Sequence, residues 1–182
     1  VLWFGKSQMS GDKILLLSDI ATKKLDSIKI TQNVFIIEKD TLKDDGYQQI
    51  KGGLLNGAFK EGKLDNIVIT KNTEMVYYLY NDEDLQLIGI DKTTCSALQM
   101  NFVDGQIDDI TFLVSPIGDV YPEEEIPIND RTLKGFVWRI KERPETVKDL
   151  FDEKDKADQF PDILKFKFPG ESEKKEIEKP LQ

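Results

Sequence analysis

Three segments of the chain share one pattern: KLDSIKI at residues 24–30, KLDNIVI at residues 63–69 and QIDDITF at residues 106–112. Each copy opens with a polar residue, an apolar residue and an aspartate, and continues into an isoleucine-bearing run of strand formers. The three aspartates, at positions 26, 65 and 108, are 39 and 43 residues apart. Repetition at this period predicts an architecture of stacked β units.

Glycine-bearing pairs precede two of the copies and indicate hairpins. Glu61-Gly62 and Asp104-Gly105 stand between apolar runs, and such pairs readily adopt the positive φ angles of a tight turn. Further strand candidates follow at residues 34–37 and 75–80. A single unit of this size cannot bury its own apolar face, so we expect the units to stack edge to edge.

Two of the strand candidates are apolar at consecutive positions. VFII at residues 34–37 and MVYYLY at residues 75–80 differ in this from the alternating Ile28-Lys29-Ile30. Strands that are apolar on both sides are typical of sheets covered on both faces. We therefore expect these strands to be covered twice, or to line an interior that something else occupies.

The repeat pattern breaks near Pro116, and the sequence beyond it changes character. Residues 121–127 predict an ordered loop with an acidic edge, and LKGFVWR at 133–139 predicts a closing strand or cap. Residues 144–151 have the proline near the start and the lysine further along that a short helix favours. We expect one domain over residues 1–151.

From residue 152 the chain is rich in lysine, glutamate and aspartate, which predicts a solvated tail over residues 152–182. Within it, ILKFKF at 163–168 alternates and has the pattern of a strand that could join an exposed edge. The chain begins at Val1 without the regions of a signal peptide, so we expect it to come from a longer polypeptide.

Composition argues against several classes of function. With 34 acidic and 25 basic residues the net charge is −9, which disfavours nucleic acid and anionic membrane surfaces. The chain has no histidine, which excludes Ser-His-Asp triads, and Cys95 is expected to be a small buried side chain. The acidic runs at residues 44–46 and 82–84 lack the spacing of a calcium loop. We expect no enzyme activity, no cofactor and no metal site.

A longer succession of segments resembles the OstA-like proteins of Bacteroidetes, which are related to LptA and to the periplasmic part of LptD. The resemblance runs in order from Leu2 to Phe151, and the tail has no counterpart. The segments that carry it are QIKG at 49–52, GKL at 62–64, LIGIDKTTC at 87–95, ITF at 110–112, YP at 121–122, LKGFVWR at 133–139 and ERP at 142–144.

The resemblance implies an all-β fold, a repeat-built β-jellyroll, or β-taco, of antiparallel strands with an open apolar groove. It implies a periplasmic protein, associated with the outer membrane, that binds and transports lipopolysaccharide by holding the acyl chains of lipid A. Partners would be other Lpt-type proteins or further copies, joined end to end by strand pairing. The family has no catalytic residues to carry over.

If hydrocarbon lies inside, the repeat register nominates the residues that face it. These are Ile28, Ile30, Leu64, Ile67, Ile69, Ile107, Ile110 and Phe112. Burial of acyl chains contributes about 0.8 kcal/mol per CH₂ group, so a few chains suffice for capture. Any one of these residues taken alone is better explained as part of an ordinary core, and the lipid hypothesis concerns the row as a whole.

All three arginines, Arg131, Arg139 and Arg143, fall within thirteen positions. The planar fork of arginine suits phosphate and carboxylate, so the cluster is a candidate for contact with a lipid head group or an acidic partner. The alternative is pairing with acidic residues of the 123–130 segment. Trp138 between them is expected to pack the end of the fold rather than to stack on a sugar.

Two other functions remain open at the level of sequence. The chain could be a structural or interaction module with a filled interior that associates through its sheet edges. It could also be a carbohydrate-active enzyme on a β scaffold, for which the acidic composition and Tyr78 and Tyr80 are the only support.

Overall fold

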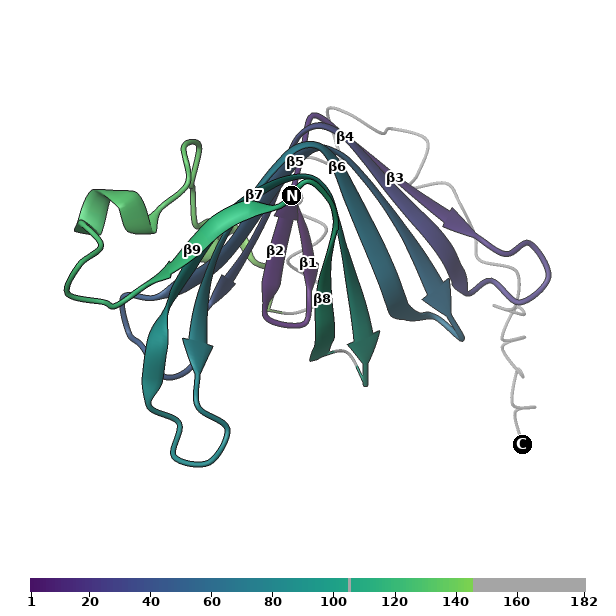
Figure 1. Ribbon diagram of the computed structural model, residues 1–182. Coiled ribbons are helices and arrows are strands. Elements are labelled where there is room, and N and C mark those ends of the chain that lie inside the picture. The colour runs from purple at the N-terminus through teal and green to yellow at the C-terminus, as the bar shows by residue number, and fades with distance from the viewer. Residues whose placement is uncertain (105, 146–182) are drawn as a thin grey trace, which may run out of the picture. The chain divides into compact units, whose positions relative to one another are not determined.

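A computed structural model describes residues 1–104 and 106–145. These residues form one large antiparallel sheet of nine strands that is not closed into a barrel (Figure 1). A compact unit spans Val1–Ile140, and a second unit, Lys141–Gln182, is described only as far as residue 145. The all-β prediction is confirmed. The domain boundary after residue 151, the helix at 144–151 and the strand at 163–168 lie wholly or mostly outside the described residues.

The strands follow one another mainly by hairpins. Their order in the sheet is β1-β2-β4-β5-β6-β7-β8, with β3 added on β4 and β9 added on β7. Two short 3-10 helices, η1 (Ile128–Arg131) and η2 (Ile140–Glu142), follow the last strand. The strands are β1 (Leu2–Phe4), β2 (Ser7–Ser10), β3 (Lys13–Ser18), β4 (Leu25–Lys39), β5 (Tyr47–Lys60), β6 (Lys63–Tyr80), β7 (Leu87–Val103), β8 (Gln106–Val114) and β9 (Ile117–Tyr121).

The long strands β4 to β7 each contribute to two arms of the sheet. β4 pairs with β3 along residues 25–31 and with β2 along residues 35–38, while β7 pairs with β9 along 90–94 and with β8 along 97–103. Figure 1 shows the long strands bending between these parts. We call the part between β3 and β8 the β3–β8 arm, and the part between β2 and β9 the β2–β9 arm.

Backbone irregularities coincide at the bend. The pairing register shifts between Thr31 and Val34 in β4 and between Thr70 and Thr73 in β6. The residues inside these shifts have positive φ angles, which regular strands do not: 60° and 51° for residues 32 and 33, and 70° and 57° for residues 71 and 72. An extra pair of residues in a ladder turns a strand sharply, so these insertions explain the two arms.

The three repeat copies occupy equivalent places in the β3–β8 arm. They begin β4, β6 and β8, which alternate with β5 and β7. Ile28, Ile67 and Ile110 lie in one row across the sheet, because Ile28 and Ile67 both pair with Gly57 and Ile67 and Ile110 both pair with Met100. The prediction that the units stack edge to edge is therefore confirmed.

A two-residue turn joins β5 to β6 at the predicted hairpin. Lys60 pairs with Lys63, and the residues between them, Glu61 and Gly62, have φ angles of 54° and 81°. Positive φ at both central positions is what a type I′ turn requires, and glutamate adopts it at a cost of about 1 kcal/mol.

Replacing Glu61 with asparagine should therefore raise the free energy of unfolding by about 0.5 to 1 kcal/mol, because asparagine tolerates the left-handed conformation. Urea denaturation of the Glu61→Asn variant measures the gain. Glu61→Gln removes the same charge without this tolerance and should leave the stability unchanged. An equal gain in both variants would show that charge, not backbone conformation, is responsible.

Two apolar clusters lie on opposite faces of the bent sheet. The inner cluster lies between the arms and contains Met9, Ile28, Ile30, Val34, Ile36, Ile50, Leu55, Leu64, Ile67, Ile69, Met75, Cys95, Leu98 and Met100. The outer cluster lies on the other face of the β2–β9 arm and contains Phe35, Ile37, Val76, Tyr78, Ile90, Ile126 and Leu133. Val34 to Ile37 alternate between the clusters, which confirms that this strand is covered on both faces.

The segment after β9 covers the outer cluster without joining the sheet. We call residues 122–140 the strap; its Ile126 and Leu133 are buried in the outer cluster, and Phe136 and Trp138 pack against it. The predicted closing strand at 133–139 is wrong in this respect, since these residues form no strand, whereas the predicted cap agrees with their packing. The predicted break in the repeat pattern near Pro116 falls between β8 and β9, and a further strand, β9, begins at the next residue.

Two buried glutamines hold the strap. The Gln49 side chain donates to the carbonyl of Arg131 over 2.8 Å and accepts from the backbone N–H of Leu133 over 2.9 Å. In the same way, Gln8 donates to the carbonyl of Val137 and accepts from the N–H of Arg139, over 2.8 and 2.7 Å. The strap thus takes its hydrogen bonds from side chains where a strand would take them from a neighbouring backbone.

Candidate functional site

The residues predicted to face a lipid lie together on the inner face of the β3–β8 arm. Ile28, Ile30, Leu64, Ile67 and Ile69 are members of the inner cluster and at most 3% exposed. The other three, Ile107, Ile110 and Phe112, are partly buried and pack against that cluster. The structure therefore brings the whole row together on one apolar surface.

The facing side of this interior belongs to the β2–β9 arm. It presents Met9, Ile36, Ile50 and Met75, all of them buried in the inner cluster. The repeat register did not nominate these residues, because they lie beyond the bend, where the pattern changes. The runs that are apolar on both sides, at residues 34–37 and 75–80, were the available signal.

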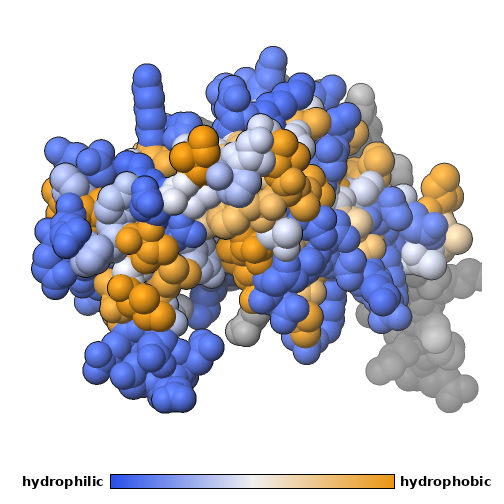
Figure 2. Space-filling view, viewed as in Figure 1, coloured by the Kyte–Doolittle hydropathy of each residue, from blue (hydrophilic) through white to orange (hydrophobic). Residues whose placement is uncertain are grey.

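A small cavity lies between the arms among the described residues. Its volume is about 20 Å³, and it is lined by residues of both arms that include Ile36, Ile50, Ile67 and Met100. That volume accommodates about one water molecule. Figure 2 shows apolar side chains reaching the surface in the middle of this view, with hydrophilic ones around them. This cavity is too small for a hydrocarbon chain, so hydrocarbon could enter it only if the arms moved apart.

Polar groups mark one edge of this cavity. Ser7, Glu38, Gln48 and Tyr77 belong to its lining, and the Ser7 hydroxyl donates to the Glu38 carboxylate. Burial, and then the negative charges of Glu38 and Asp40, raise the pKa of the Tyr77 hydroxyl above its ordinary value. Tyr77 therefore stays neutral at physiological pH and keeps its proton as a hydrogen-bond donor beside a carboxylate.

The cysteine has no features of a nucleophile. Cys95 is 8% exposed in the inner cluster, and burial raises the pKa of its thiol above the ordinary value. A thiol without thiolate character is a poor nucleophile. Among residues 1–104 and 106–145, no group of three or more Cys, Asp or Glu side chains is placed to hold a metal ion.

Of the three arginines, Arg131 has its partners within the first unit of the chain. The guanidinium of Arg131 donates to a carboxylate oxygen of Glu123 over 2.9 Å and to the Glu123 backbone carbonyl over 2.7 Å. Lys43 and Arg131 together lower the pKa of the Glu123 carboxyl. Arg139 belongs to the strap, and Arg143 belongs to the second unit. Trp138 meets the ring of Trp3 edge-on at 5.2 Å, which agrees with its expected packing role.

Both ends of the sheet expose apolar side chains. β3 pairs only with β4 among the described residues, and Leu15, Leu16 and Leu17 on it are 40–51% exposed. At the opposite end, β8 and β9 pair only with β7 in the same part of the chain, and Ile117 is 75% exposed. Unpaired strand edges with apolar side chains are templates for association.

The described residues contain no helix that is long and apolar enough to cross a membrane. Comparisons with protein-family models, with curated proteins and with solved structures find no match for this chain.

Proposed function

We propose that this chain is a non-enzymatic lipid-binding protein of the lipopolysaccharide-transport type, with an open-sided β-jellyroll fold. It holds the acyl chains of lipid A between the two arms of its sheet, in the periplasm or at the outer membrane. The observation that supports this most directly is the inner cluster, which covers the facing sides of both arms in a sheet that is not closed into a barrel.

Uptake of an acyl chain requires the arms to part about the bend. The cavity of about 20 Å³ between the arms is too small to hold any part of an acyl chain. Parting the arms exposes apolar side chains, and each CH₂ group that enters returns about 0.8 kcal/mol. Because the arms are continuous only through strands β4 to β7, their far ends can separate without breaking a ladder.

The two ends of the sheet that are unpaired among the described residues supply the second part of the proposal. Pairing the β3 end of one molecule with the β8–β9 end of another, or with an Lpt-type partner, would align their interiors and cover leucines that now face solvent. Such pairing extends the apolar path from one molecule to the next. It also satisfies the unpaired backbone groups of both edges.

The second candidate is an interaction module that associates through these same edges and binds no lipid. One observation favours it, which is the filled interior: Ile30, Leu55, Ile67, Ile69 and Leu98 are all 0% exposed. A core packed in this way is stable without a ligand. Under this candidate, self-association is independent of lipid.

A photo-crosslinking side chain separates the two candidates. Ile110 and Thr111 are neighbours on β8, but Ile110 packs against the inner cluster whereas Thr111 is exposed on the other face. The purified chain is incubated with lipopolysaccharide and irradiated with the crosslinker at one position or the other. We expect adducts several-fold more abundant from position 110, because only that position faces the interior.

Equal adduct yields from the two positions would indicate surface adsorption. The absence of adducts at position 110, together with oligomers that form equally with and without lipid, would contradict the transport proposal and support the interaction module.

A further inference from the structure

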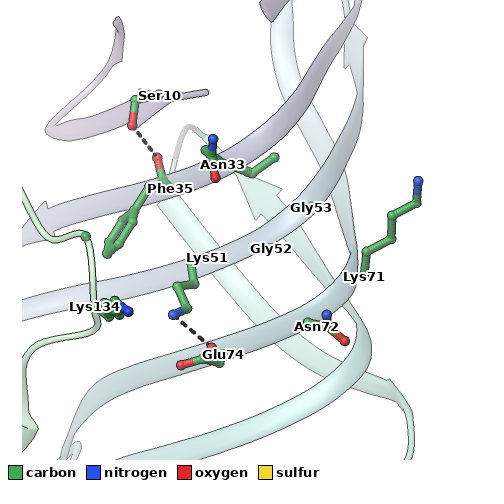
Figure 3. Close-up of a pocket in the computed structure, with 12 residues that line it drawn as sticks. Ser10, Asn33, Phe35, Lys51, Gly52, Gly53, Lys71, Asn72, Glu74 and Lys134 are labelled. Atoms are coloured by element: carbon green, nitrogen blue, oxygen red, sulfur yellow. Dashed lines mark hydrogen bonds and ion pairs between the residues drawn. The ribbon is translucent and has the colours of Figure 1, made fainter. Parts of the chain in front are cut away.

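A second hollow lies on the opposite face of the sheet from the inner cluster. It measures about 450 Å³ and is built at the bend, with Gly52 and Gly53 of β5, Lys71 and Asn72 of β6, and Lys134 of the strap among its lining. Phe35, a member of the outer cluster, also lines it, which places the hollow on the outer face. Figure 3 shows Lys134 and Lys71 toward opposite ends, with Lys51 and Glu74 between them.

Gly53 leaves the hollow beside Lys71 free of a side chain, whereas a side chain on Gly52 would lie against Ile69 of the inner cluster. A Cβ atom on Gly53 would lie 2.8 Å from the Cβ of Lys71, and one on Gly52 would lie 2.5 Å from the Cγ2 of Ile69. Either approach is too close, so neither position accepts a larger residue without movement of its neighbour. The hollow lies at the same backbone irregularity that bends the sheet.

The charge of the lining is opposite to the charge of the chain. Three lysines, Lys51, Lys71 and Lys134, face one glutamate, Glu74, which gives the lining a net charge of +2, whereas the whole chain carries −9. Lys51 pairs with Glu74 at 2.8 Å. Within residues 1–104 and 106–145, Lys71 and Lys134 have no ion pair, so both ammonium groups remain available to a ligand.

We propose that this hollow binds a phosphate monoester. Such a group carries a charge of about −1.5 to −2 at neutral pH, which the +2 of the lining neutralises. Lysine ammonium groups attract phosphate as point charges, so Lys71 and Lys134 favour the anion from opposite ends of the hollow without both touching it, and the Asn72 amide adds a neutral donor. Phe35 and Gly135 form an apolar wall against which the organic part of the ester rests.

The test uses the full chain labelled with ¹⁵N and two sources of the same group. One arm titrates glycerol 3-phosphate, and the other adds phosphatidylcholine vesicles that contain phosphatidic acid, with pure phosphatidylcholine vesicles as the reference. We expect saturable amide shifts at Gly52, Gly53 and Gly135. Shifts with glycerol 3-phosphate identify a soluble ligand, and shifts or broadening only with phosphatidic acid identify a lipid head group.

The double variant Lys71→Gln/Lys134→Gln should weaken binding by roughly tenfold or more, since it takes the net charge of the lining from +2 to 0. The matched control is Lys13→Gln/Lys29→Gln, which removes the same charge from exposed positions on the β3–β8 arm outside the hollow. Shifts that do not saturate in either arm, or equal weakening in both double variants, would overturn the proposal. If the first variant fails to fold, the location of the shifts in the native chain decides. The outcome is independent of the crosslinking at position 110, which probes the other face.

Discussion

Replacing Ile67 with alanine is expected to lower the free energy of unfolding by about 3 kcal/mol. Ile67 is 0% exposed and lies in the inner cluster, where it pairs across the ladder with Gly57 on one side and Met100 on the other. The truncation loses the transfer free energy of the deleted carbons and leaves a cavity that the surrounding strands cannot fully close. Urea denaturation followed by circular dichroism measures the loss.

The same variant tests whether the interior admits hydrocarbon. If the arms can part, an acyl chain fills the new cavity, and a ligand that binds only the folded state raises stability with its concentration. A fatty acid or lipopolysaccharide should then raise the melting temperature of the Ile67→Ala variant more than that of the unaltered chain. In a permanently closed module, the added lipid changes neither.

Ile37→Ala is the matched control. Ile37 is 1% exposed, as deeply buried as Ile67, but it lies in the outer cluster beneath the strap. We expect a similar loss of stability and no recovery with lipid. Recovery of equal size in both variants would mean that lipid binds to the fold in general. A loss below about 1 kcal/mol for Ile67→Ala would contradict the view that the interior is a tightly packed core.

The sequence predicted the parts of the fold that depend on local periodicity. The three copies of the pattern begin equivalent strands because alternation with period two fixes which side chains face inward. Ile28, Ile67 and Ile110 therefore lie in one row, as the register predicted. The turn at Glu61-Gly62 was equally predictable, since few residue pairs tolerate positive φ.

What the sequence could not supply is the bend. Residues 34–37 were expected to form a separate downstream strand, yet they continue β4 after a two-residue irregularity at Gln32 and Asn33. No local pattern indicates which residues of a long strand will leave the ladder. Without the bend, the facing residues of the β2–β9 arm could not be assigned to the same interior as the repeat copies.

The strap was partly missed for a different reason. Residues 133–139 have the composition of a strand. The backbone groups of this part of the strap, however, hydrogen-bond to the side chains of Gln8 and Gln49, which lie more than eighty positions earlier in the sequence. Both glutamines are at most 1% exposed. A buried glutamine that replaces a ladder partner has no signature in a single sequence, because glutamine is also common on exposed strands.

Replacing Gln49 with leucine is expected to cost about 3 kcal/mol of stability. Leucine fits the apolar surroundings, but it leaves the N–H of Leu133 and the carbonyl of Arg131 without their partner in a dry environment. Each abandoned buried group costs about 1 to 3 kcal/mol. Denaturation measures the loss, and Trp138, a strap residue that packs against the outer cluster, should report the local change through its fluorescence.

Gln99→Leu is the control for this substitution, since the Gln99 side chain donates only to the Asn101 side chain and supports no backbone group of the strap. It should change stability by less than about 1 kcal/mol.

The decisive result is the double variant of Gln8 and Gln49. Because both side chains hold one continuous segment, losing the second after the first has released the strap should cost less than losing it alone. Strictly additive losses would show that the two glutamines hold the strap independently, and that residues 131–139 do not act as one unit.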